Sequence, residues 1–95
     1  MHGEKHAAIS QYLSANFAGI GIEHKPDFDR DAQSFKVHLQ NGTLLLKVGN
    51  EFIGDSDTAE ILRLFESWDL KEVMTSEKER GILVTRQGFE FFIRG

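Results

Sequence analysis

The N-terminal part of the chain has a helical spacing of apolar positions, followed by a short alternating segment. Over Glu4–Ala18 the spacing of three and four residues predicts a helix with one buried stripe, formed by Ala8, Ile9, Tyr12, Leu13, Asn16 and Phe17. Gly19 and Gly21 are expected to end this helix, because glycine tolerates the left-handed conformation common at helix ends. Apolar and polar residues then alternate over 20–25, which predicts a short strand that Pro26 stops.

Two alternating segments around Asn41-Gly42 predict a β-hairpin. Both residues tolerate the positive φ that a two-residue type I′ turn requires, so we expect the turn to be centred on them. The inner face would then pair apolar residues only: Leu39 with Leu44, Val37 with Leu46 and Phe35 with Val48. The outer face would pair Gln40 with Thr43, His38 with Leu45 and Lys36 with Lys47. A slip of one residue would exchange the two faces, so this pattern specifies the register strongly.

The second half of the chain begins with a possible extension of the hairpin strand to Phe52 or Ile53. Asp57 and Glu60 then have the spacing of a capping box, which predicts a helix that ends near Ser67 or Trp68. Its apolar face would be formed by Ile61, Leu62, Leu64, Phe65 and Trp68. Strands are expected over 70–75 and 82–87, joined by a charged loop, and Gly88 is either a bulge or a break before a further strand over 89–93.

These elements predict an α+β fold. Their order is α-β-β-β-α-β-β, and we expect the two helices to pack on one face of an antiparallel sheet. The 95 residues match one domain, with no repeat and no domain-scale linker.

Composition restricts the function classes. The chain contains no cysteine, so it has no disulfide framework or thiolate metal site, which fits a cytoplasmic location. The N-terminal sequence lacks the pattern of a signal peptide, and no stretch has the length and apolarity of a membrane span, so no membrane partner is expected. The net charge of −4 disfavours a general nucleic-acid binder, which usually carries a basic surplus.

No short motif indicates catalysis, a metal or a cofactor. The alternating aspartates 27, 29 and 31 lack the glycine and glutamate that a calcium-binding EF-hand loop needs at later positions. His2 and His6 have the spacing of one helical face but no zinc-protease motif around them, and His24 and His38 fall on different predicted strands. The glycine pair 19 and 21 follows a helix and lacks the third glycine of a dinucleotide-binding fingerprint. We therefore expect no catalytic residue, metal ligand or cofactor, and a non-enzymatic protein.

The outer face of the predicted hairpin is a candidate anion or nucleic-acid contact. Lys36, His38 and Lys47 gather there, with Lys36 directly opposite Lys47. Like charges opposed across a sheet are destabilising unless an anion relieves them. The simpler interpretation is that long lysine side chains extend into water and discourage aggregation at the sheet.

The C-terminal segment is a candidate protein interface. Phe89, Phe91, Phe92 and Ile93 place apolar groups on both sides of the last predicted strand, so the strand is either buried on both faces or partly covered by a partner. We take Phe89, Phe91 and Phe92 as the candidate interface residues. The hairpin predicted over 81–92 resembles the wing of a winged helix-turn-helix. That fold needs a recognition helix before the hairpin that enters a DNA groove, but Gly81 limits the helix here to about one turn, which is too short.

Three functions follow from the sequence. The first is a non-enzymatic protein-interaction or assembly module that forms a homodimer or binds another protein. The alternative is a nucleic-acid-binding or regulatory domain that uses the Lys36, His38 and Lys47 face or the winged-helix-like hairpin. The third is a small enzyme or ligand binder with a cleft between helix and sheet.

Overall fold

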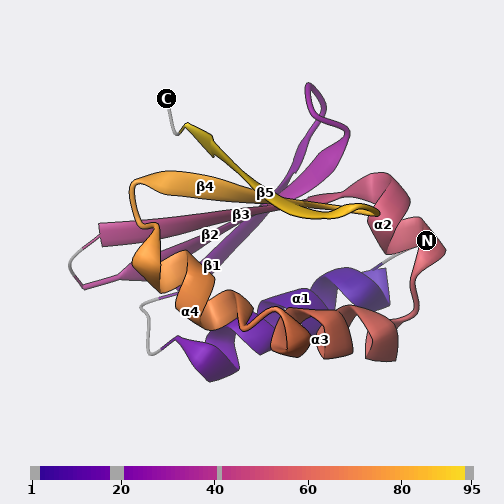
Figure 1. Ribbon diagram of the computed structural model, residues 1–95, viewed down its shortest axis with the longest axis horizontal. Helices are drawn as coiled ribbons and strands as arrows, with labels where there is room; N and C mark the ends of the chain where they lie inside the picture. Colours follow the sequence, from indigo (N-terminus) through magenta and orange to yellow (C-terminus); the bar gives the residue numbers. More distant parts are fainter. Residues whose placement is uncertain (1–2, 18–20, 41, 94–95) are drawn as a thin grey trace.

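A computed structural model describes residues 3–17, 21–40 and 42–93 (Figure 1). The helices are α1 (Gly3–Asn16), α2 (Asn50–Asp55), α3 (Thr58–Ser67) and α4 (Leu70–Ser76). The strands are β1 (Gly21–Asp27), β2 (Ala32–Leu39), β3 (Gly42–Gly49), β4 (Arg80–Thr85) and β5 (Gly88–Ile93). The following parts of the predictions lie outside the described residues: His2, the helix end at Ala18 and Gly19, Ile20 of the first strand, and Asn41 of the hairpin turn.

The strands form one sheet in the order β1-β2-β3-β4-β5; α1, α3 and α4 lie on one side of it, and α2 lies at the end of β3 (Figure 1). The α+β class is therefore confirmed. The prediction of an antiparallel sheet is wrong at one pair of strands, because β3 and β4 pair in parallel. Parallel neighbours need a crossover connection, and here α2, α3 and α4 supply it between the end of β3 and the start of β4. The opposite side of the sheet, which we call the open face, carries no helix among the described residues (Figure 1).

The predicted element order is wrong in the region between β3 and β4. Residues 50–55 form α2, not an extension of the strand, and Phe52 and Ile53 point into the core from it. Residues 70–76 form α4, not a strand. Leu70, Val73 and Met74 have helical spacing, and Leu70 and Met74 are buried. The described chain thus has four helices where two were predicted.

The hairpin of β2 and β3 exists, but its register differs from the prediction by two residues. Leu39 pairs with Gly42, Val37 with Leu44, and Phe35 with Leu46. A shift of two residues leaves every side chain on its predicted face, because side chains alternate with a period of two. Both registers therefore place the same side chains in the core, although the observed one pairs Leu39 with Gly42 and Val48 with Gln33 in place of the apolar partners predicted for them. As a consequence, Lys47 lies opposite Ser34 and not opposite Lys36.

The core lies between the helical layer and the sheet. From α1 it receives the predicted apolar stripe, of which Ile9, Tyr12 and Leu13 are buried. From α3 it receives Ile61 and Phe65, and the Phe65 ring meets the Tyr12 ring edge-on at 5.3 Å. The predicted N-cap of α3 is confirmed, because Asp57 Oδ1 accepts a hydrogen bond of 2.8 Å from the backbone N–H of Glu60.

Candidate interaction surface at the sheet edge

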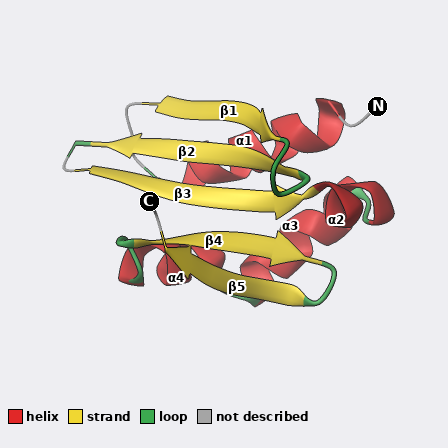
Figure 2. Ribbon diagram, turned by 90° about the horizontal axis from the view of Figure 1, so that it is seen from above, coloured by secondary structure: helices red, strands yellow, loops and turns green. Residues whose placement is uncertain are grey.

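Strand β5 forms one edge of the sheet and pairs only with β4 within the described chain (Figure 2). The turn between them ends at Gly88, whose φ of 119° favours glycine. Of the two predicted roles for Gly88, the break before a further strand is therefore the observed one. Figure 1 shows that β5 rises toward its C-terminal end, away from the helical layer. Within the described residues, no strand pairs with the outer backbone edge of β5.

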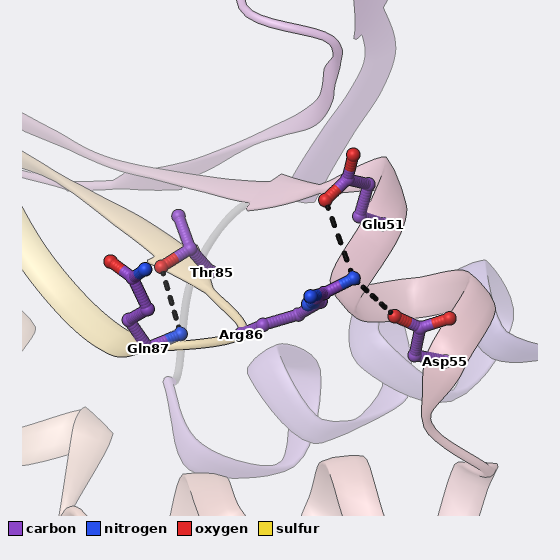
Figure 3. Close-up of polar contacts among 5 residues, drawn as sticks. All are labelled: Glu51, Asp55, Thr85, Arg86 and Gln87. Atoms are coloured by element: carbon purple, nitrogen blue, oxygen red, sulfur yellow. Dashed lines mark hydrogen bonds and ion pairs between the residues drawn. The ribbon is translucent and has the colours of Figure 1, made fainter.

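The β4–β5 turn is tied to α2 by charged groups (Figure 3). Arg86 Nη1 lies 3.0 Å from Asp55 Oδ2 and 3.6 Å from Glu51 Oε2, both on α2. Within the turn itself, the backbone N–H of Gln87 donates to Thr85 Oγ1 at 3.2 Å. Exposed ion pairs of this kind each stabilise a fold only slightly, by roughly 0.2–1 kcal/mol. Their effect here is to orient the turn from which β5 starts. Nothing in the sequence spacing indicates this contact, since Arg86 and Asp55 are 31 residues apart.

The helix-facing side of β5 is apolar and becomes more exposed along the strand. Phe89 is partly covered by Trp68, whose ring centroid lies 5.5 Å away. Phe91 is 40% exposed and Ile93 is 87% exposed, although both alternate with Phe89 on the same face. The guanidinium of Arg80 lies 5.7 Å from the Phe91 ring and covers only part of it. Phe91 and Ile93 therefore form an apolar row that the helices do not cover.

Phe92 belongs to the opposite side of β5, on the open face. Its ring lies against the backbone of Gly81, where a Cβ atom would come within 2.1 Å of the ring. The Arg30 guanidinium lies 4.6 Å above the ring centroid, and the Lys47 ammonium lies 5.7 Å from it. The predicted interface residues thus divide between two surfaces: Phe89 and Phe91 face the helical side, and Phe92 is half-buried on the open face.

The predicted basic residues Lys36, His38 and Lys47 share the open face, but acidic groups accompany them. His38 Nε2 lies 3.2 Å from Glu23 Oε1 on β1, and Lys36 pairs across the strands with the same residue. Lys47 forms an ion pair with Asp27. The hydrogen bond from Lys47 holds the pKa of the Asp27 carboxyl below its ordinary value. The opposition of Lys36 and Lys47 that the sequence predicted is absent, because the register differs.

An open hollow of about 470 Å³ lies beside this ion pair. It is lined by Lys25, Pro26, Asp27, Phe28, Asp29, Arg30, Ser34 and Lys47. Positive and negative groups alternate around it, so it has no strong preference for an anion. Elsewhere, the His6 and His24 rings meet edge-on with centroids 5.0 Å apart. Among the residues that the structure describes, no three His, Asp or Glu side chains are grouped so that they can hold a metal ion.

Sequence reasoning named Ile93 as one of the apolar groups of this strand and missed Arg30 as a member of the surface. Ile93 continues the alternation of Phe89 and Phe91, so its face was predictable, but its exposure depends on where the helices end. Arg30 lies in a polar stretch with no pattern that relates it to Phe92, and only the three-dimensional fold brings the two together.

Comparisons with known proteins add no assignment to this geometry. No protein-family model matches the chain, and no curated protein or solved structure is significantly similar to it. No helix in the described ranges has the length and apolarity to cross a bilayer.

Proposed function

We propose that the protein is a non-enzymatic interaction module that binds a partner polypeptide by strand addition at β5. One observation carries this proposal: an edge strand presents Phe91 and Ile93, exposed by 40% and 87%, beside an unpaired backbone edge. Strand addition obtains affinity from main-chain hydrogen bonds and specificity from alternate side chains, and β5 offers an outer backbone edge together with alternating apolar side chains. Burial of the exposed parts of these two side chains would supply roughly 25 cal/mol for each Å² removed from water.

The contrast between the two sheet edges supports the same proposal. Strand β1, the other edge, has Pro26 within it and carries Glu23 and Lys25. Proline and charged residues discourage pairing at an edge. Strand β5 has the sequence Gly-Phe-Glu-Phe-Phe-Ile, in which Glu90 is the one charged residue. The sheet is therefore protected at β1 and open to a partner at β5.

The nucleic-acid alternative receives less support from the same surface. His38 and Lys47 have Glu23 and Asp27 as acidic partners, which reduces the positive field of the open face. Non-specific affinity for nucleic acid depends on several phosphate contacts from basic groups. The winged-helix version needs a recognition helix, whereas α4 has 7 residues and uses Leu70 and Met74 for the core.

The test compares two equally exposed apolar residues. Ile93→Asp places a charge on the β5 edge, and Phe28→Asp places one in the β1–β2 loop, where Phe28 is 88% exposed. Both variants should fold, because neither residue belongs to the core. Wild type and both variants are used to capture partners from the source lysate, with and without nuclease, and self-association of each is measured by sedimentation.

We expect the wild type and Phe28→Asp to bind the same partner, or to self-associate to the same degree, and Ile93→Asp to lose that binding. In the bound state, amide hydrogen exchange of 88–93 should slow, since strand addition protects the edge N–H groups. Binding that is unchanged in Ile93→Asp would contradict the proposal. Partners that disappear with nuclease would favour the nucleic-acid alternative in its place.

A further inference from the structure

We propose that the strand added to β5 is β5 of a second copy of this chain, paired antiparallel about a two-fold axis at Phe91. This inference rests on the proposed function of the β5 edge and names its partner. The dimer would contain one continuous sheet, with both helical layers on the same side. β5 is the edge strand of the sheet opposite β1, and in Figure 2 it begins at the outer margin and crosses β4 toward its C-terminal end.

The alternation of side chains limits the possible registers. A two-fold axis perpendicular to the sheet keeps each face on its own side, so every residue must oppose a residue of the same face. One register places Phe91 opposite its own copy, Phe89 opposite Ile93, and Glu90 opposite Phe92. There are two neighbouring registers. One places Glu90 opposite its own copy and Phe89 opposite Phe91, and the other places Phe92 opposite its own copy and Phe91 opposite Ile93.

Charge disfavours both neighbouring registers. The Phe92-centred register would bring together two rings that each carry Arg30 and Lys47. A Glu90–Glu90 pair would oppose two carboxylates directly, which destabilises a sheet. The Phe91-centred register instead brings Glu90 of one copy to the ring of Phe92 in the other. Arg30 lies 4.6 Å from the centre of that ring and Lys47 lies 5.7 Å from it. Among the described residues no carboxylate is within ion-pair distance of the Arg30 guanidinium, so it is available to the incoming Glu90.

The same register completes the apolar row on the helical side. Phe91 meets its own copy at the axis, and each exposed Ile93 meets the partly covered Phe89 of the other copy. The surface is therefore complementary to itself in two respects, apolar to apolar and carboxylate to guanidinium. An arbitrary strand would not meet both requirements, and for this reason we assign the site to a second copy.

The chain contains no cysteine, so single cysteines report the register directly. Residues directly opposite have Cα atoms about 4.5–5.5 Å apart, within the range of about 4.4–6.8 Å that a disulfide spans. Residues offset by two positions are about 7–8 Å apart and lie outside it. Phe91→Cys should therefore form a disulfide-linked dimer under mild oxidation, and Glu90→Cys should not. The reverse result would overturn the Phe91-centred register.

Charge reversal tests the second contact by sedimentation equilibrium. Because the axis repeats each contact, Glu90→Arg and Arg30→Glu should each raise the dimer Kd about tenfold or more. The chain that carries both changes should recover affinity to within about tenfold of wild type, since the pair is restored with opposite polarity. Glu4→Arg, the same charge change on α1, serves as the control and should leave the Kd unchanged. Equal weakening in the double variant would contradict the contact.

Different results would contradict the proposed strand addition at β5 and the assignment of a second copy as the partner. A chain that stays monomeric at every concentration, while Ile93→Asp abolishes its capture of another protein, would overturn the second-copy inference and leave the proposed function intact. A dimer that is unaffected by Ile93→Asp would contradict both.

Discussion

The packing of Phe92 on Gly81 provides the most direct test of the open face. A Cβ atom at Gly81 would lie 2.1, 2.4 and 2.6 Å from three carbons of the Phe92 ring, distances at which the ring must move. The backbone itself accepts alanine, because the φ of Gly81 is not positive. Gly81→Ala therefore perturbs one thing, the position of the Phe92 ring, and with it the contacts that Arg30 and Lys47 make with that ring.

The magnitude follows from two opposing effects. Overpacking typically costs about 1–3 kcal/mol, and we expect the lower part, about 1–2 kcal/mol, because the half-buried ring can turn toward solvent. In a Phe92→Ala background the obstacle is absent, and Gly81→Ala should stabilise by roughly 0.4–1 kcal/mol through the reduced entropy of the unfolded chain. The sign of the effect should therefore reverse, with a coupling free energy of about 1.5–3 kcal/mol.

Urea unfolding of the wild type, the two single variants and the double variant measures this coupling, provided that the m-value stays constant. The set is repeated at a second protein concentration, because self-association would contribute to the apparent stability. Gly21→Ala is the matched control, since nothing lies within 4 Å of its added Cβ. An equal cost of Gly81→Ala in both backgrounds would refute the placement of the ring. The interface argument based on Arg30 would then lose its foundation.

Three further outcomes are expected. Asp57→Ala should reduce the free energy of unfolding by about 0.5–2 kcal/mol in urea titrations, and Asp57→Asn by much less, because asparagine also caps a helix. Phe65→Ala should cost about 3–5 kcal/mol, measured in the same way, since the side chain is fully buried; a cost below about 1 kcal/mol would place it outside the core. The Asp27 carboxylate, with its pKa lowered from 3.8 mainly by the Lys47 hydrogen bond, adds stability at neutral pH that is lost as the pH falls through its folded pKa. Asp27→Asn should therefore destabilise at neutral pH and converge with the wild type in acid, and a constant difference across pH would contradict this linkage.

Local signals predicted the parts of the fold that depend on neighbouring residues. The capping residue Asp57 and the stripe that contains Ile61 and Phe65 are set within a few residues, and the structure confirms α3. The two faces of the β2–β3 hairpin follow from alternation and are also confirmed. The predicted register is wrong by two residues. A shift of two conserves both faces, so burial of the apolar face does not fix the pairing.

The helical crossover was not predicted, although Leu70, Val73 and Met74 have helical spacing. Only Trp68 and Asp69 separate α3 from α4, and Asp69 adopts the left-handed conformation with a φ of 52°. Glycine is the usual residue in a left-handed conformation at a helix end, and no glycine is present here. The β-branched residues Val73 and Thr75 favour a strand, which is what we predicted over 70–75. The parallel pairing of β3 with β4 depends on this misread crossover, so the sheet was predicted as antiparallel.

One part of the candidate surface could be predicted from neighbouring residues, and the other part depends on segments that are distant in the sequence. The aromatic residues of β5 were predicted as an interface from their alternation alone. The partners that give them different roles come from distant segments: Trp68 covers Phe89, and Arg30 lies on Phe92. A single strand pattern cannot indicate which of its two faces another element will cover, and here the two faces are covered to different degrees.

The difference between the two edges also determines how far assembly can extend. Pairing of β5 with its own copy consumes the β5 edge of both chains, so the sheet of the dimer ends in two β1 strands. Each β1 carries Glu23, Lys25 and Pro26, which oppose the addition of another strand. A head-to-tail contact between β5 and β1 would repeat without limit and form fibres, whereas the isologous contact closes after two chains. The charged, proline-containing β1 edge is therefore the feature that would keep the aromatic β5 edge compatible with a discrete dimer.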